Sequence, residues 1–379
     1  MKRRPVHIIF VIILSVVFVL PVWNLAFKSM PDASSNEHRK LAAFPQFIPA
    51  AIDSFPPAYD AWWTDHFPFR NALINTRMLI DIYAFRQSPI PAFVIIGKNN
   101  WLYNTGHEID VYRGTNRFTK DQLKRLQERL LAKKEFIKSH KATMIFVIAP
   151  LKYSVYPEYL PLNLNRINRE SRTDQFVKAL EDAGIIYVDL RKVLIQAKND
   201  TMPLFYKGDN HWNHQGAFIA YQAVLSKIRE YFSGTGAPLT NADYKITAHY
   251  TSRGNLSDML FMKEGCGDYK YHYQRISVNK TVTDTHNVYT PPKYFRIKED
   301  YEERYSNSDP QSPKILIIRD SFGDHITWFL KEHFRETVSI FDAWEYKLNP
   351  EIIIREKPDI VMYIVLESFL DTQLNEKGQ

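Results

Sequence analysis

The stretch Lys314–Gly323, "KILIIRDSFG", joins an apolar run to a polar turn and decides the fold class. The run is short and β-branched, which is typical of a strand buried on both faces of a parallel sheet. A helical pattern, "HITWFLKEHF", follows almost at once. Four further apolar runs alternate with helical patterns along the chain: "ATMIFVIAP" (142–150), "IIYVDL" (185–190), "VSIFDA" (338–343) and "DIVMYIVLES" (359–368). Five such strands predict an α/β domain with a mostly parallel sheet covered by helices on both faces.

The connections between these strands predict how the layers are arranged. Crossovers between parallel strands are right-handed almost without exception, so the expected fold is a doubly wound, flavodoxin-like three-layer sandwich. A polar, Tyr-rich segment from Ser233 to Pro313 has no helical periodicity and predicts a β-rich insertion. We therefore assign residues 101–375 to the α/β domain, with this insertion at 233–313, and residues 29–100 to a neck rich in proline and aromatic residues.

The N-terminal segment predicts a membrane anchor. Lys2, Arg3 and Arg4 precede the apolar run Val6–Phe27, which is long enough to span a hydrocarbon core as one helix. By the positive-inside rule, residues 1–28 form a cytoplasmic tip and a transmembrane helix, and the rest of the chain lies outside the cytoplasm. A cleaved signal peptide is the alternative, but no small-x-small cleavage site follows the run. The expected location is the inner (cytoplasmic) membrane, single-pass, with the α/β domain facing the periplasm.

Composition argues against several kinds of site. The chain has one cysteine, Cys266, so it has no internal disulfide framework and no zinc site built on several thiolates. Neither GxGxxG nor GxxxxGK(S/T) occurs, so the usual signatures of nucleotide phosphate binding are missing. The net charge of +7 is spread along the chain and not gathered in a basic block, which leaves anionic lipid and acidic polymers as candidate contacts. We expect no metal, no cofactor and no nucleic acid.

Ser321 stands where a strand ends and a helix begins. In open parallel sheets, ligand sites lie at the carboxyl ends of strands, because loops and helix N-termini converge there. A serine at this position has an exposed hydroxyl, and its backbone N–H is free to face an oxyanion. The alternative is that Asp320 or Ser321 only caps the following helix, which is a common use of both residue types.

The stretch Phe205–Ala217, "FYKGDNHWNHQGA", places a carboxylate and two imidazoles on one loop before a helical pattern. Asp209, His211 and His214 are suitable metal ligands, but no second cluster supplies the missing ligands. Asn213 or His214 could instead cap the helix. The third possibility is that His211 is a general base and Asp209 is the carboxylate that orients it, which lacks only a nucleophile such as Ser321.

The combination of "GDNHW" with a later "RDSFG", after an apolar N-terminal run, resembles the SGNH-hydrolase-like proteins of the alginate O-acetyltransferase group and the related DHHW proteins. Five further segments resemble that family in the same order: "DHFPFRNALI" (65–74), "IGKNNWLY" (96–103), "APLKYSVYPEYLP" (149–161), "RGNLSDML" (253–260) and "KPDIVMYIVLES" (357–368). In this family the Asp-x-His pair precedes the serine, reversed from most SGNH hydrolases, as in a circular permutation. The chain departs from the family pattern at Arg319, where many members have glycine, and at Glu367-Ser368, where an acidic residue and arginine often stand.

The resemblance implies a role for each part of the candidate site. It implies that Ser321 is the nucleophile, His211 the general base and Asp209 the orienting acid of an O-acetyltransferase that modifies an extracytoplasmic polysaccharide such as alginate. It also implies a membrane-bound O-acyltransferase as the partner that delivers acetyl groups. Around this site we assign five residues to substrate contacts or the rim of the cleft, with Asn255 as a second oxyanion donor: Lys152, Tyr156, Trp212, Arg319 and Asn255. Lys152 and Tyr156 follow the end of the first strand and would line the cleft, or else be a solvated lysine and a packed tyrosine. Trp212 would stack on a sugar ring, or else wedge the loop against the core.

Two other functions use the same residues. A carbohydrate esterase would share the acyl-serine and pass the acyl group to water. A catalytically inactive glycan-binding or scaffold component of a secretion complex would explain Arg319 and Glu367-Ser368. His325 is an alternative base four residues after Ser321, but the Asp209-x-His211 pair would then have no role, and His214 is expected to be a bystander at the helix start.

Overall fold

The computed structural model describes residues 7–12, 14–15, 19, 23, 27, 40–67, 70–199, 201–262, 264–277, 281–293, 295, 298–342 and 345–374. The chain divides into two units, Met1–Arg86 and Gln87–Gln379. Half of the apolar run Val6–Phe27, the predicted anchor, lies outside the described residues. Among the residues that are described, no helix is both long enough and apolar enough to cross a membrane.

Among the described residues of the first unit are the helices α2 (Phe55–His66) and α3 (Arg70–Tyr83). Its contacts are largely aromatic: the ring of Trp62 lies 4.9 Å from that of Phe44 and stacks on His66 at 5.2 Å. The carboxylate of Asp65 accepts a hydrogen bond from the backbone N–H of Ala42 at 2.8 Å. Asp65 and His66 therefore hold this unit together.

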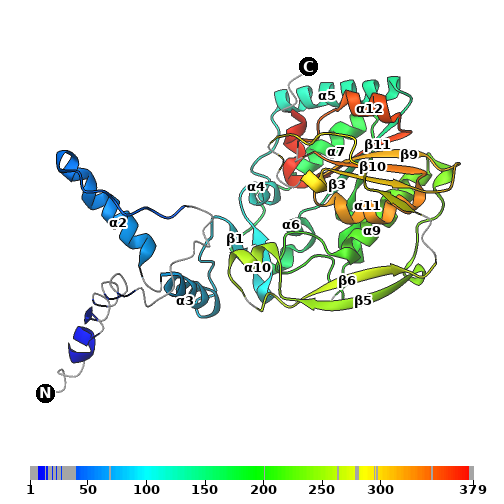
Figure 1. Ribbon diagram of the computed structural model, residues 1–379. Coiled ribbons are helices and arrows are strands. Elements are labelled where there is room, and N and C mark those ends of the chain that lie inside the picture. The colour runs from blue at the N-terminus through cyan, green and yellow to red at the C-terminus, as the bar shows by residue number, and fades with distance from the viewer. Residues whose placement is uncertain are drawn as a thin grey trace. The chain divides into compact units, whose positions relative to one another are not determined.

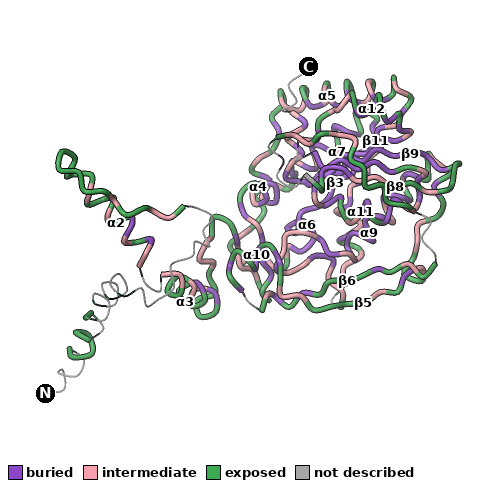
Figure 2. Tube along the Cα trace, viewed as in Figure 1, coloured by how far each residue is buried: buried purple, intermediate pink, exposed green. Residues whose placement is uncertain are grey.

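A seven-stranded sheet forms the centre of the second unit, in the order β4-β3-β11-β9-β10-β8-β7 (Figure 1). Five strands run parallel: β3 (Thr143–Ala149), β4 (Ile186–Asp189), β9 (Lys314–Arg319), β10 (Glu336–Phe341) and β11 (Ile360–Leu366). They coincide with the five predicted apolar runs, and Figure 2 shows β3, β9 and β11 buried at the centre of the unit. The predicted parallel α/β sheet is confirmed.

The order of the parallel strands is a permuted flavodoxin order. Counted from the N-terminus, these five strands lie side by side as 2-1-5-3-4. Counted from β9 instead, through β11 and back to β3 and β4, they lie as 2-1-3-4-5, which is the order of flavodoxin-like sheets. The topological switch point, where such folds bind their ligands, then lies between β9 and β11. Ser321 follows β9 directly and so lies at this point.

Helices cover both faces of the sheet, as Figure 1 shows. On one face, Phe218, Ile326 and Phe329 pack against Ile317 and Ile364 of the sheet. The helices on this face are α4 (His107–Arg113), α6 (Lys152–Val155), α8 (Leu190–Ala197), α9 (His214–Arg229) and α11 (Gly323–Leu330). On the other face lie α5 (Lys120–Ser139), α7 (Arg172–Asp182) and α12 (Pro350–Glu356). The result is the expected three-layer sandwich.

In its described residues, the predicted insertion holds two pairs of strands and a short α-helix. Strands β5 (Tyr244–Thr251) and β6 (Asp268–Arg275) form an antiparallel hairpin, joined through α10 (Asn255–Met259). Strands β7 (Val282–Asp284) and β8 (Glu302–Ser306) extend the main sheet, where β8 pairs antiparallel with β10. The sequence did not predict that these two strands join the parallel sheet.

The second unit begins before the predicted domain start at residue 101. Strand β1 (Val94–Ile96) pairs with β2 (Leu102–Asn104), so residues on both sides of that boundary form one small sheet. The N–H of Leu102 then donates to the carbonyl oxygen of Lys207 at 2.9 Å, which ties this sheet to the loop that carries Asp209 and His211. The end of the predicted neck therefore belongs to the α/β unit.

Candidate active site

Ser321 lies in the sharp turn between β9 and α11. Gly323 allows this turn, because a Cβ at its position would lie 2.5 Å from the Arg319 side chain. The backbone N–H of Ser321 donates to no acceptor in the part of the chain that the structure describes. The turn therefore presents a hydroxyl and an unused N–H at the start of a helix, where the helix dipole also favours negative charge.

The carboxylate of Asp320 holds this turn in place. Its carboxylate is fully buried and accepts hydrogen bonds from the N–H of Phe322 at 2.7 Å, the N–H of Leu366 at 3.0 Å and the hydroxyl of Tyr346. Burial raises the pKa of Asp320 despite these bonds. Because Leu366 is the last residue of β11, Asp320 joins the Ser321 turn to the neighbouring strand across the switch point.

The structure brings Ser321, His211 and Asp209 together. His211 Nε2 lies 2.8 Å from Ser321 Oγ, and His211 Nδ1 lies 2.7 Å from Asp209 Oδ1. Burial would raise the pKa of Asp209, but the hydrogen bond and charge of His211, with backbone N–H groups, lower it to about 2. Burial likewise opposes a charge on His211, but Asp209 outweighs it and raises the pKa of His211. A hydroxyl, an imidazole and a carboxylate in this order form the arrangement of a serine hydrolase triad.

Two buried groups of opposite charge hold the loop that carries Asp209 and His211. The Lys152 ammonium is only 2% exposed and donates to the carbonyl oxygens of Tyr206 at 3.0 Å, Lys207 at 3.2 Å and Asp209 at 2.6 Å. The Asp268 carboxylate accepts from the N–H groups of Lys207 at 2.6 Å and Gly208 at 2.8 Å. Burial lowers the pKa of Lys152 to about 8. Lys152 therefore positions the loop from inside.

Asn255 supports Asp209 from the start of α10. Its backbone N–H donates to Asp209 Oδ2 at 2.9 Å, and its side chain exchanges hydrogen bonds with Asn210. Gly254 makes this approach possible, because a Cβ there would lie 2.5 Å from the carbonyl oxygen of Gly208. Asn255 therefore contacts the Asp209-Asn210 turn. The expectation from the sequence was instead that Asn255 donates a hydrogen bond to the oxyanion.

Besides Lys152, three more of the five residues expected at the substrate are buried: Tyr156, Trp212 and Arg319. The ring of Trp212 has no exposed surface and packs 5.1 Å from that of Phe322, so it wedges the loop against the core and offers no surface to a sugar. Arg319 is 1% exposed, since its guanidinium pairs with Glu303 at 3.3 Å and with Asp324. Arg319 therefore does not form the rim of the cleft, and that expectation was wrong.

Tyr156 is a packed tyrosine, the alternative to a position in the cleft. It is 4% exposed, its hydroxyl accepts from the N–H of Leu204 at 2.9 Å, and its ring lies 4.5 Å from that of Trp101. It lines a separate cavity of about 450 Å³ whose lining does not include Ser321 or His211. Tyr156 supports the base loop from behind and does not line the cleft at Ser321.

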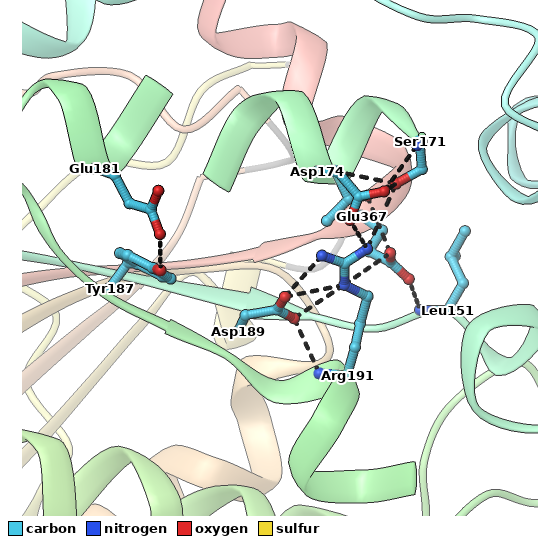
Figure 3. A network of polar contacts seen from close by, with 9 residues as sticks. Leu151, Ser171, Asp174, Glu181, Tyr187, Asp189, Arg191 and Glu367 are labelled. Atoms are coloured by element: carbon cyan, nitrogen blue, oxygen red, sulfur yellow. Dashed lines mark hydrogen bonds and ion pairs between the residues drawn. The ribbon is translucent and has the colours of Figure 1, made fainter. Parts of the chain in front are cut away.

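Figure 3 shows a polar network in which Arg191 lies beside Glu367. The residue that follows Glu367 in the sequence is Ser368, where the family pattern often has arginine. The buried Glu367 carboxylate accepts from the N–H of Leu151 at 2.7 Å and lies 3.9 Å from Arg191 Nε. Arg191 also pairs with Asp189 at 2.7 Å and Asp174 at 2.8 Å. These contacts join the ends of β3, β4 and β11. The residues of this network are far apart in the sequence, so no local motif predicts that they meet.

The remaining candidates are a metal site, a cap for α9 and the thiol of Cys266. No group of three or more His, Cys, Asp or Glu side chains within the described residues could hold a metal ion, so the metal interpretation of Asp209, His211 and His214 gains no support. Asn213, and not His214, caps α9: its side chain accepts from the N–H of Gly216. Burial raises the pKa of the Cys266 thiol to about 12, so this cysteine is a poor nucleophile.

Residues 94–339 match the model of a protein family described as the SGNH hydrolase-like domain of the acetyltransferase AlgX. The chain belongs to this family. The resemblance expected from the sequence is thereby confirmed. Among its SGNH hydrolase-like relatives is the probable alginate O-acetylase AlgJ of Pseudomonas syringae pv. tomato, which is 25% identical over 259 residues. That alignment covers 68% of this chain and 61% of the relative.

Solved structures share the SGNH hydrolase-like fold of this chain. Bacillus cereus PatB1 with a sulfonyl adduct superposes with a TM-score of 0.59 at 17% identity, over 76% of this chain and 99% of that one. A DHHW family protein from Eubacterium siraeum superposes with a TM-score of 0.52 at 15% identity, over 75% and 98% of the two chains. At these identities the likeness concerns the fold alone.

Proposed function

We propose that this protein transfers acetyl groups to hydroxyl groups of a polysaccharide outside the cytoplasm, through an ester on Ser321. The observation that carries the proposal is the continuous hydrogen-bonded chain from Ser321 through His211 to Asp209. Membership of a family described by an acetyltransferase, and relatives named as probable alginate O-acetylases, support acetyl transfer.

In the first step His211 acts as general base. Its Nε2 takes the proton of Ser321 as Oγ attacks the carbonyl carbon of the acetyl donor, and Asp209 holds the imidazolium that forms. The N–H of Ser321 and the start of α11 face the developing oxyanion, an interaction worth roughly 3–4 kcal/mol per donor. The donor's leaving group departs with the proton from His211, and the acetyl group remains on Ser321.

In the second step a sugar hydroxyl replaces the donor. His211 takes the hydroxyl proton as the sugar oxygen attacks the ester carbon, and the tetrahedral intermediate collapses with cleavage of the bond to Ser321 Oγ. Oγ recovers its proton from His211. The products are an acetylated sugar and free Ser321, so the site is ready for another donor.

The proposed acceptor is an alginate-like polysaccharide. Relatives of this chain are named for alginate, and a net charge of +7 suits a polymer that carries carboxylates. The proposed location is the inner membrane, with the α/β unit in the periplasm, on the strength of the basic N-terminus and the apolar run Val6–Phe27. Acetyl thioesters are made in the cytoplasm, so the proposed donor partner is a membrane-bound O-acyltransferase.

The test uses the full chain with p-nitrophenyl acetate as donor and an alginate oligosaccharide as acceptor. Mass spectrometry of the digested protein should find an acetyl group on Ser321, and chromatography should find acetylated oligosaccharide. The Ser321→Ala variant should give neither while it keeps the circular dichroism of the wild type. A wild-type protein that releases only acetate, with the oligosaccharide in excess, is an esterase; a wild-type protein that carries no acetyl group on Ser321 refutes the acyl-serine pathway.

A further inference from the structure

A cavity of about 650 Å³ lies beside the candidate active site, and neither the family match nor the triad assigns it a role. Its volume falls within the range of ligand pockets, roughly 300–1,000 Å³. Two of its walls continue the segments that carry the triad. His214 is the first residue of α9, three residues after His211, and His325 lies on α11 four residues after Ser321. The third wall is β6 of the hairpin, through His272.

The cavity adjoins the turn that carries Ser321. The backbone N–H of Asp324, a lining residue, donates to the carbonyl oxygen of Ser321 at 3.4 Å, and His325 follows Asp324 on α11. The ring of Phe322, next to Ser321 in the chain, lies 5.0 Å from that of His211. Burial lowers the pKa of His325 to about 4. The cavity therefore lies beside the turn of the nucleophile, and its lining includes neither Ser321 nor His211.

Two neutral imidazoles form one side of the cavity. The rings of His214 and His325 lie 4.1 Å apart and meet nearly edge to face, at 72°. His214 Nδ1 is buried and has no hydrogen-bond partner in the described part of the chain. Burial and the neighbouring His325 lower the pKa of His214 to about 3, so both rings are uncharged at neutral pH. A neutral imidazole has one donor and one acceptor, and a sugar hydroxyl can serve both.

The acidic groups of the cavity are already paired. Asp324 pairs with Arg319, and Glu332 lies 2.8 Å from Arg275. No unpaired carboxylate among the described lining residues therefore remains to repel an anionic sugar or to attract a cation. Trp328, 47% exposed, adds a broad apolar surface to this lining. Such a mixture of aromatic surface and neutral hydrogen-bonding groups suits the two sides of a pyranose ring.

We propose that this cavity is the subsite for the acceptor sugar. The inference rests on the proposed function and adds to it the place where the second substrate binds. His325 and His214 hydrogen-bond the sugar hydroxyls, Trp328 covers an apolar face of the ring, and the attacking hydroxyl reaches the Ser321 ester beside His211. Its proton passes to His211 Nε2 and then to Ser321 Oγ, as the ester bond to the serine breaks and the new ester bond to the sugar forms. Filling the cavity with sugar also keeps water from taking the acetyl group.

If the cavity binds the acceptor sugar, variants of its lining residues should change how much of the acetyl group passes to sugar and how much to water. The His325→Phe variant keeps a planar ring of similar size but removes both nitrogens, and Trp328→Ala removes an exposed surface with little risk to folding. With p-nitrophenyl acetate and an alginate oligosaccharide, the ratio of acetylated sugar to free acetate should fall by about tenfold in His325→Phe, the loss expected for one hydrogen bond to a substrate hydroxyl. The Ser321 acetyl adduct should still form. Trp328→Ala should shift the ratio in the same direction.

The matched control is His249→Phe. His249 is exposed on β5 and its ring lies 5.2 Å from that of His272, but it does not line the cavity. This variant should keep the wild-type ratio. An unchanged ratio in both His325→Phe and Trp328→Ala overturns the subsite, and so does a parallel loss of the Ser321 adduct and of transfer. A wild-type protein without a Ser321 adduct is a different result, because it refutes the proposed function itself.

Discussion

The ammonium group of Lys152 lies 2.6 Å from the carbonyl oxygen of Asp209, whose carboxylate lies 2.7 Å from His211 Nδ1. Lys152 is buried and holds the loop that carries Asp209 and His211. It sets the backbone of Asp209, while Asn255 sets one oxygen of its carboxylate. The position of His211 against Ser321 depends on both.

Replacing Lys152 with Met should cost stability and acetyl transfer together. Three backbone carbonyls lose their donor in the interior, and we expect the free energy of unfolding to fall by roughly 3 kcal/mol. The rate of Ser321 acetylation should fall further than the fraction of folded protein, because the loop no longer fixes Asp209. Denaturant unfolding and the burst of p-nitrophenol measure the two effects. Lys198→Met is the control, since Lys198 donates to Val155 and Glu158 and not to this loop.

Asp209→Asn should shift the pH dependence of acetylation. His211 must be neutral to accept a proton, so the rate falls as the pH drops through the pKa of His211, which Asp209 raises above its ordinary value of 6.5. Without the charge of Asp209 this limb should move to lower pH, and the rate on its plateau should fall by roughly 10³–10⁴. A pH–rate profile of p-nitrophenol release checks both. A limb at the same pH in both proteins would contradict the assigned role of Asp209.

Asp320 and Tyr346 should be coupled in stability. Tyr346→Phe leaves the buried Asp320 carboxylate with one partner fewer, and we expect it to lower the free energy of unfolding by about 1–2 kcal/mol. Asp320→Asn should cost more, because an amide nitrogen would face either the N–H of Leu366 or that of Phe322. Denaturant unfolding of the single variants and the double variant measures the coupling. Strictly additive effects would mean that the hydrogen bond is unimportant.

Trp212→Ala tests whether this ring contacts sugar or core. A fully buried tryptophan replaced by alanine should lower the free energy of unfolding by roughly 3–5 kcal/mol. We expect no separate loss of oligosaccharide affinity in the fraction that stays folded, as titration calorimetry at low temperature would show. A stable variant with weakened sugar binding would place the ring in the acceptor site after all.

The sequence predicted the elements that local pattern controls. The five parallel strands followed from short apolar runs. The positions of Ser321, Asp209 and His211 relative to strands and helices allowed a triad among other possibilities, and the resemblance to a family selected it. Arg319 shows the limit of such reasoning. It ends a strand, so its surroundings depend on the neighbouring strands, and Glu303 reaches it from β8 only because the insertion adds β7 and β8 to the sheet.

Contacts between segments that are far apart in the sequence were the other feature that could not be predicted from the sequence. Lys152 meets backbone carbonyls that lie 54 to 57 positions further along the chain, and backbone acceptors leave no mark in a sequence. Whether Trp212 stacks on sugar or packs inside depended on Phe322, which comes from the nucleophile turn. The same applies to Arg191, which reaches Glu367 from a different strand end.

Strand β11 follows the other four parallel strands in the sequence but lies at the centre of their group, where it pairs with β3 on one side and β9 on the other. Until it is in place, the half of the sheet that leads to Asp209 and His211 has no hydrogen-bonded connection to the strand that leads to Ser321. During synthesis β11 leaves the ribosome after these four strands. We therefore expect a chain truncated before Ile360 to be inactive, because Ser321 and His211 come within reach of each other only once β11 joins β3 to β9. The position of one strand thus makes the chemistry depend on residues that follow the nucleophile in the chain.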